Sequence, residues 1–358
     1  MIKVNTNLFG ILKTWVSIMG ILSACLMQTV GIAANPTSIF DLMNHQEVLE
    51  VTLEGDFEIL KEKRRSSEGQ KVSLKFVDAN GAEQLWNIEI TLRGNFRRMR
   101  CTAMPPMKLN FKKKELKEAG LAKFDDMKLV TQCMQDDDDS KAAVLKEYLA
   151  YKIYNEITDE SFKVQLLKIT YKDTKSGKST KQWGFLIEDT AQMRNRLGVE
   201  KAEQERGLKK DAFNQTSLYK TAVFQYMIGN SDWDKTACRN VKMVVKDGKT
   251  LMIPYDFDFS GLVDASYAMY NSNYEMSSVQ DRIYMGFEDD LVNLDATLDF
   301  YKTKQSSIKE LVKNFKVLRM ADRRVALNYL NSFYNNIDTI EYKAKKAATT
   351  SELVSEID

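Results

Sequence analysis

The chain has 358 residues, of which 44% are hydrophobic and 28% are charged, so it can bury a substantial core. Its net charge of +2 comes from residues 1–34, which contain Lys3 and Lys13 and no acid, and the remainder balances 50 basic against 50 acidic side chains. This balance gives no electrostatic reason to expect nucleic acid as a partner, and a single histidine, His45, argues against Ser-His-Asp, Cys-His or histidine-rich metal chemistry.

Residues 1–34 are typical of an export signal, because two lysines precede an apolar stretch from Trp15 to Ala34. Leu22-Ser23-Ala24-Cys25 has the form of a bacterial lipobox, which would leave Cys25 lipidated. Gly31-Ile32-Ala33-Ala34 would instead suit an ordinary signal peptidase, and about 20 apolar residues would also suffice for an uncleaved span. We expect export to the periplasm, cell envelope or extracellular space, with a membrane contacted only through the signal or a lipid anchor.

Residues from about 46 to 190 are mostly strand-like, with turn signals such as Asp78-Ala79-Asn80-Gly81 between the runs. The expected strands cover residues 48–57, 71–77, 85–92, 107–111, 127–131, 164–171 and 182–187. One helix is expected from Ser140 to about Ile157, with acidic residues at its N-terminus.

Cys101 and Cys133 each follow a predicted strand, so neighbouring strand ends could bring them within disulfide reach. Two buried free thiols are the alternative, and Cys238 would remain unpaired in either case. None of the cysteine spacings is a zinc pattern.

After about residue 190 the pattern becomes helical. Residues 215–228 are apolar on nearly every side, which indicates a buried helix, and residues 305–318 and 321–337 predict two amphipathic helices. A sheet-rich half with one helix followed by a helical half is typical of a bilobal, kinase-like α+β domain. We expect one continuous domain over residues 35–350 and a polar tail at 351–358.

Two acidic clusters flank a predicted β-hairpin and indicate a metal and nucleotide site. Asp232-Trp233-Asp234 leads to Asn240, and the hairpin then leads to Asp256-Phe257-Asp258. Phosphoryl transfer needs an Asp that orients the attacking hydroxyl and an Asn and a second Asp that hold Mg²⁺. On an extended segment Asp256 and Asp258 would point to the same side, and two carboxylates within an apolar run are costly to bury without a cation.

With these landmarks in this order, residues 85 to 290 resemble the CotH family of protein kinase-like proteins, which includes secreted atypical kinases. Arg93-Gly94-Asn95 with Arg97-Arg98 is similar to its Arg-Gly element, and Pro106 to Phe111 is similar to its lysine-bearing strand. The helix at 145–151, the strand 184–189 and the two acidic clusters follow in the family's order.

The resemblance implies a bilobal kinase-like fold, with an antiparallel N-terminal lobe over about 46–190 and a mainly helical C-terminal lobe over about 205–340. It implies Asp232 as the catalytic aspartate, with Asp234 as a rival, and ATP with Mg²⁺ or Mn²⁺ as cofactors. The other roles it implies are metal ligation by Asn240, Asp256 and Asp258 and nucleotide binding by Lys108, Arg93 and Glu147, with Glu147 as the partner of Lys108.

The chain departs from kinases in lacking a Gly-rich loop before the lysine strand and a histidine before Asp232. The expected function is phosphoryl transfer from ATP to a hydroxyl of a protein or glycan. A catalytically inactive binding protein at the cell surface or in the periplasm is the alternative. Asp256-Phe257-Asp258-Phe259-Ser260 also resembles the haloacid dehalogenase phosphatase motif, which normally opens a doubly wound domain near the chain start.

Overall fold

The computed structural model describes residues 36–134, 138–343 and 346 of the chain. The predicted signal at 1–34, the proposed lipidation site Cys25 and the polar tail at 351–358 lie outside these residues. Within the described residues, no helix combines the length and the apolar character that crossing a membrane requires.

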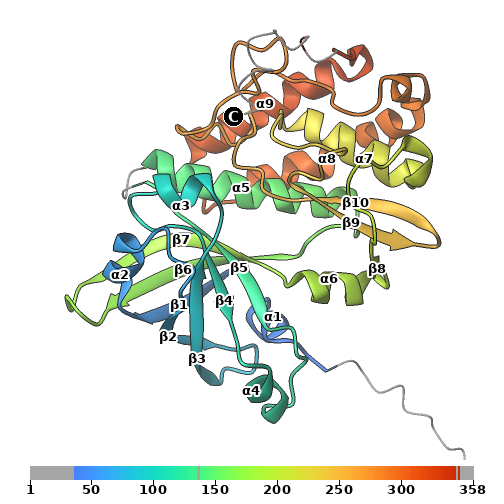
Figure 1. The fold of residues 1–358 in the computed structure, drawn as a ribbon. Coiled ribbons are helices and arrows are strands. Elements are labelled where there is room, and N and C mark those ends of the chain that lie inside the picture. Colours follow the sequence, from blue (N-terminus) through green and yellow to red (C-terminus); the bar gives the residue numbers. More distant parts are fainter. Residues whose placement is uncertain (1–35, 135–137, 344–345, 347–358) are drawn as a thin grey trace, which may run out of the picture. The chain divides into compact units, whose positions relative to one another are not determined.

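Seven strands of the first half form a closed barrel in the order β1-β2-β3-β4-β5-β7-β6 (Figure 1). Their bounds are β1 (Val48–Gly55), β2 (Gln70–Val77), β3 (Glu83–Leu92), β4 (Met107–Asn110), β5 (Asp126–Thr131), β6 (Val164–Asp173) and β7 (Ser179–Ile187). Neighbouring strands are antiparallel except at the closure, where β1 pairs with β6 in parallel and Val51 lies opposite Ile169.

The predicted bilobal protein kinase-like fold is therefore wrong. The first half is a closed barrel and not an open lobe, because β1 bonds to β2 along one edge and to β6 along the other. It also contains more than the one predicted helix, namely α1 (Ile39–Met43), α2 (Phe57–Glu62), α3 (Phe96–Arg100), α4 (Lys113–Glu118), α5 (Asp138–Ile157) and α6 (Thr190–Leu197). The described chain is a sheet-rich α+β protein.

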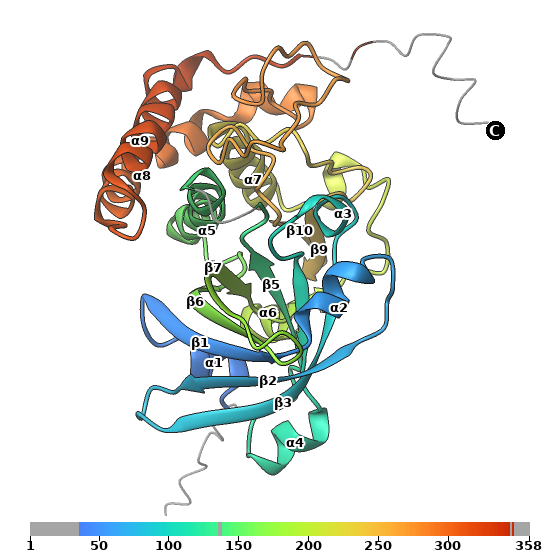
Figure 2. The same cartoon turned by 90° about the vertical axis from the view of Figure 1, so that its left-hand side faces the viewer.

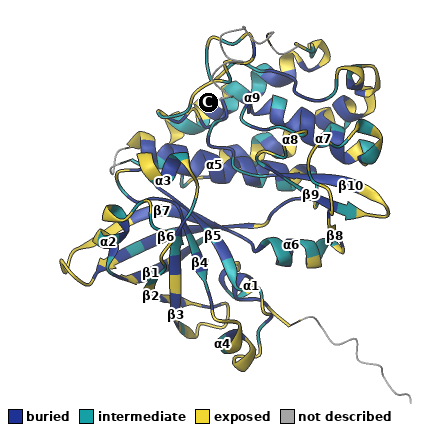
Figure 3. Ribbon diagram, in the orientation of Figure 1, coloured by how far each residue is buried: buried dark blue, intermediate teal, exposed yellow. Residues whose placement is uncertain are grey.

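Side-chain alternation explains the barrel strands. In β1, Leu49, Val51 and Leu53 are buried while Glu50 and Glu54 face solvent. Buried side chains from all seven strands form one apolar cluster, whereas others from β5, β6 and β7, such as Leu166 and Phe185, belong to a second cluster that includes α5. Figure 3 colours the buried positions along the barrel ribbon dark blue. All seven predicted strands are confirmed in position, although their ends shift by a few residues.

Helix α5 lies between the barrel and the second half of the chain, as Figure 1 and Figure 2 both show. It contacts β6 and β7 on one side and α8 (Asp295–Asn314) on the other. Because it packs on both sides, it is buried along most of its length, and the polar side chains Lys146 and Glu147 are buried with it.

The second half of the chain combines helices with a small sheet. Helix α7 (Gln215–Met227) is capped by Asn214, whose side chain accepts a hydrogen bond from the Ser217 N–H. A three-stranded sheet in the order β10-β9-β8 contains the predicted hairpin. Helix α8 begins ten residues before the predicted start of the amphipathic helix at 305–318. The remaining bounds are β8 (Glu200–Lys201), β9 (Val241–Lys246), β10 (Lys249–Pro254), α9 (Met320–Asn335) and 3₁₀ helices at Lys210–Ala212, Glu288–Asn293 and Ile337–Thr339.

Candidate functional site

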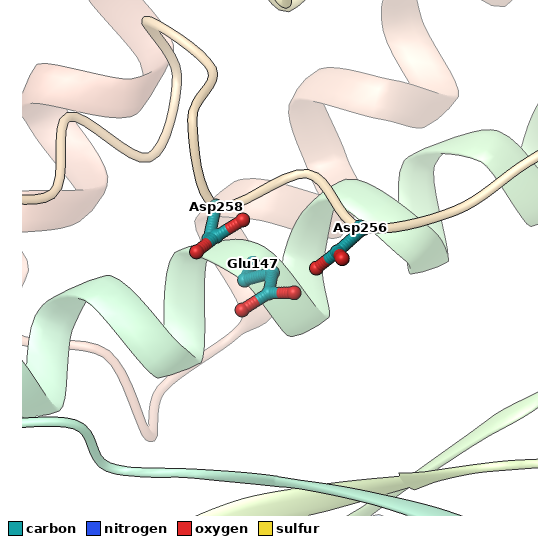
Figure 4. Close-up of side chains that lie close together, drawn as sticks. All are labelled: Glu147, Asp256 and Asp258. Carbon is teal, nitrogen blue, oxygen red and sulfur yellow. The ribbon is translucent and has the colours of Figure 1, made fainter. Parts of the chain in front are cut away.

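Three carboxylates converge where α5 meets the segment after β10. Glu147 projects from α5, and Asp256 and Asp258 lie on the chain that passes over it (Figure 4). One oxygen from each of the three lies within 4.8 Å of the others. We call Glu147, Asp256 and Asp258 the acidic cluster.

Aromatic packing fixes the two aspartates over the helix. The Asp256 N–H donates to the Tyr151 hydroxyl at 2.8 Å, and Tyr151 lies one turn after Glu147 on α5. Between the aspartates, the ring of Phe257 is fully buried, 4.5 Å from Tyr151 and 5.3 Å from Phe224. The segment is not extended as predicted, because Asp256 has a φ of 66°, in the left-handed region. The carboxylates meet through this local turn and not through strand alternation.

Arg97 is the buried cation that contacts this cluster. Arg97, on α3, donates from Nη1 to Glu147 Oε2 at 3.0 Å, and the same nitrogen lies 3.7 Å from Asp258 Oδ2. Its Nη2 donates to the Thr131 carbonyl at 2.8 Å. One guanidinium therefore faces three carboxylates, which leaves the cluster short of positive charge.

Burial raises the pKa of Glu147, and the neighbouring Asp258 and Asp256 raise it further, against the opposing effect of Arg97. Burial and Asp256 likewise raise the pKa of Asp258, while Arg97 and a bond from Tyr267 offset part of the effect. Although Arg97 contacts Glu147 directly, the pKa values of Glu147 and Asp258 both stay raised. The cluster favours an additional cation or bound protons.

Two oxygens of the cluster lack a hydrogen-bond partner despite complete burial. They are Glu147 Oε1 and Asp258 Oδ2, on side chains that are 1% and 6% exposed. Buried acceptors in proteins are nearly always paired, so two unpaired carboxylate oxygens on one centre are unusual. Hard divalent cations prefer such oxygen ligands, and the residues fit Mg²⁺ or Mn²⁺.

Asp232 and Asn240 form a second polar pair beside the acidic cluster. Asn240 donates from Nδ2 to the Asp232 carbonyl at 2.6 Å and to its Oδ2 at 3.0 Å. Burial and the nearby Asp256 raise the pKa of Asp232, while Arg239 and Asn240 partly offset this. Asn240 therefore orients Asp232, and its predicted role as a metal ligand stays a prediction.

Asp234, the predicted rival of Asp232, has a different position. Its Oδ1 accepts bonds from the N–H groups of Thr236 and Ala237 at 2.7 and 2.8 Å. Its backbone also pairs with that of Arg239, which closes the turn before β9. The carboxylate of Asp234 thus stabilises this turn.

Lys108 does not pair with Glu147 as the resemblance implied. Its Nζ lies 2.7 Å from Asp126 Oδ2, and its side chain is 36% exposed. Arg97 takes the place beside Glu147 that was predicted for a lysine. Directly opposite Lys108 in the β4–β5 pairing lies Lys128, which the sequence analysis did not select.

Lys128 belongs to a group of cations next to the acidic cluster. Its Nζ lies 4.6 Å from the centre of the Tyr255 ring, and Lys242 lies 5.6 Å from the same centre. Burial, with smaller effects of Arg93 and Lys242, lowers the pKa of Lys128 to about 8, against the attraction of Asp256 and Asp126. We call Arg93, Lys128 and Lys242 the basic group.

None of the three side chains of the basic group forms an ion pair within the part of the chain that the structure describes. Three cations that form no ion pair within the described residues therefore lie beside the three carboxylates, two of which lie within ion-pair distance of Arg97. Repulsion within the basic group favours an anionic ligand, and phosphate is an anion that Arg and Lys side chains commonly bind.

No protein-family model matches this chain, and no curated protein matches it. The resemblance to the CotH family accordingly stays a prediction.

Proposed function

We propose that this protein binds a divalent cation and the phosphate groups of ATP between the acidic cluster and the basic group, and transfers a phosphoryl group to a hydroxyl of a protein or glycan. The observation that carries the proposal is that two buried carboxylate oxygens without a hydrogen-bond partner lie next to three basic side chains that form no ion pair in the described residues. The proposal depends on this site and not on the overall fold.

The residues fit complementary roles in such a reaction. Glu147, Asp256 and Asp258 supply oxygen ligands to the cation, which would neutralise charge on the phosphates. Arg93, Lys128 and Lys242 supply positive charge for phosphate oxygens that the cation does not reach. Each group thus compensates a different part of the charge of a metal–nucleotide complex.

Asp232 fits the role of general base. Its Oδ2 is oriented by Asn240 and lies in the field of Asp256, and its pKa is raised by burial. A carboxylate whose pKa is raised is a stronger proton acceptor for a substrate hydroxyl. The proposal therefore assigns proton removal to Asp232 and cation binding to the acidic cluster.

The test is transfer of labelled γ-phosphate from Mn·ATP to casein, a hydroxyl-rich acceptor protein. Transfer by the wild-type protein that falls by at least about 100-fold in Asp232→Asn supports the assignment. Asp234→Asn is the matched control, because an Asn oxygen can still accept the two turn N–H bonds. Equal loss in both variants, or unchanged transfer by Asp232→Asn, contradicts the role of Asp232. Binding of Mn·ATP without transfer would favour the inactive binding protein.

A further inference from the structure

The Cys101–Cys133 disulfide joins the two segments that hold Arg97. Cys101 directly follows α3, which carries Arg97, and Cys133 lies two residues after Thr131, the last residue of β5. The Cα atoms are 4.4 Å apart, and both cysteines are buried. The pairing that the sequence left open is therefore present in the structure.

Both segments contribute directly to the position of the Arg97 side chain. Thr131 accepts the Arg97 Nη2 bond through its carbonyl, so β5 supports the guanidinium from one side. The Arg97 Nη1 donates a hydrogen bond to Glu147 Oε2, while Glu147 Oε1 has no hydrogen-bond partner. The orientation of Glu147 in the acidic cluster thus depends on where α3 lies relative to β5.

Helix α3 has little local stability of its own. It contains five residues, and its N-cap Asn95 makes no side-chain capping bond. Helices this short are not stable without tertiary contacts. Two hydrogen bonds assist the disulfide at this junction, from the Ala103 N–H to the Cys133 carbonyl and from the Thr131 hydroxyl to the Met104 carbonyl.

We propose that the Cys101–Cys133 disulfide is a positioning element of the site, which fixes Arg97 against Glu147 so that the site binds metal–nucleotide fully only after the bond has formed. This inference rests on the proposed function. Removing the disulfide frees α3 to move away from β5. The guanidinium then no longer orients Glu147, and its positive charge is lost near the anionic nucleotide complex; both effects weaken binding.

Forming the bond requires an oxidant. The two thiols lose two electrons and two protons as the S–S bond forms, and a disulfide-exchange partner accepts them and becomes a dithiol. Newly made, reduced protein would therefore have a weaker site than the oxidised protein. Such coupling ties binding capacity to an oxidising compartment.

The experiment measures the affinity for Mn·ATP in the oxidised wild-type protein and in the double variant Cys101→Ala/Cys133→Ala. We expect at least about a tenfold weaker affinity in the double variant, in the range seen when the partners that orient metal ligands are lost. Cys238→Ser, which removes a cysteine outside this disulfide, should bind like the wild type. Equal affinity in the double variant and the wild type overturns the proposal.

A double-mutant cycle separates positioning of Arg97 from general loosening of the fold. If the disulfide acts through Arg97, removing it from the Arg97→Lys variant should weaken Mn·ATP binding by less than twofold further. Two independent, multiplying losses would overturn the proposal, because they would assign the disulfide a general structural role.

If the wild-type protein does not bind Mn·ATP, the proposed function is rejected. That result alone does not show whether the disulfide holds α3 and Arg97 against β5. Trypsin cleavage after Arg97, the buried arginine of α3, followed by mass spectrometry, tests that role without any ligand. Cleavage at a buried arginine requires local opening, so it should be at least about tenfold faster in the double variant. Equal cleavage rates in the two proteins overturn the proposal.

Discussion

The carboxylate of Asp173 and those of Glu147 and Asp258 in the acidic cluster have opposite environments. Asp173, at the end of β6, accepts bonds from the Phe57 N–H at 2.8 Å and from the N–H and hydroxyl of Ser176. These bonds lower its pKa. Glu147 and Asp258 instead have raised pKa values and one unpaired oxygen each. A carboxylate that stabilises the fold is surrounded by donors, whereas one that is available to a ligand is not.

The largest expected effect follows from removing one member of the acidic cluster. Asp258→Asn should lower the affinity for Mn²⁺ by about 100-fold, because it removes an anionic ligand. The stability of the cation-free protein should not fall, since the change removes a buried charge that competes for Arg97. Binding isotherms and thermal unfolding measure the two quantities. A loss of stability with unchanged affinity would place Asp258 with the fold-stabilising carboxylates.

The second prediction compares two lysines that face each other across β4 and β5. Lys128→Met should weaken Mn·ATP binding by about tenfold and leave the affinity for Mn²⁺ alone nearly unchanged, because its charge is directed at phosphate. Lys108→Met is the matched control and should change both affinities by less than twofold, since Lys108 is paired with Asp126 near the surface. Equal effects of the two substitutions would contradict the assignment of the basic group.

The third prediction concerns Asp173. Asp173→Asn should lower the melting temperature at pH 7 and leave Mn²⁺ binding unchanged, because it weakens bonds to α2 and to the turn after β6. The pKa of Asp173 is lowered in the folded protein, so its contribution to stability is present above the ordinary carboxyl range. The difference between variant and wild type should shrink as the pH falls below about 4. A difference that is independent of pH would contradict this.

The smallest effect is the pH dependence of the cation-free protein. Because the pKa values of Glu147 and Asp258 are raised, the folded state binds more protons than the unfolded chain above about pH 4.5. Stability from these groups therefore falls as the pH rises towards 8. Mn²⁺ should raise the melting temperature more at pH 8 than at pH 5.5, and Asp258→Asn should flatten the profile. A larger Mn²⁺ effect at pH 5.5 would contradict the account.

The sequence was sufficient for the local elements and not for the closure of the sheet. Alternating side chains such as Leu49, Val51 and Leu53 predict strands, because burial on one side of a strand has a period of two. The barrel closes through a parallel pairing of Val51 with Ile169, far apart in the chain, and no local pattern encodes that contact. The order of strands and helices alone therefore led to the wrong fold class.

The site residues that lie close together in the sequence could be predicted. The hairpin brings Asp232 and Asn240 near Asp256, and sequence reasoning selected all three. Arg97 was not selected as the partner of Glu147, because it lies in an arginine-rich segment and nothing in the sequence tells which arginine is buried.

Lys128 had a visible but ambiguous signal. Met-Lys-Leu occurs at 107–109 and again at 127–129, so two strands carry a lysine in the same pattern. Only their three-dimensional positions distinguish the lysine beside Tyr255 from the one paired with Asp126.

The most direct test is the Mn²⁺ dependence of the melting temperature for wild type, Asp256→Asn and Asp247→Asn. Asp247 is the matched control, because it is an exposed aspartate at the tip of the same hairpin and also has a positive φ, of 51°. Binding to the folded state stabilises it by about 2.7 kcal/mol at a ligand concentration a hundredfold above Kd. We predict a rise in wild type and Asp247→Asn that is lost in Asp256→Asn. No rise in wild type, or an equal rise in all three proteins, would contradict a cation site at the acidic cluster.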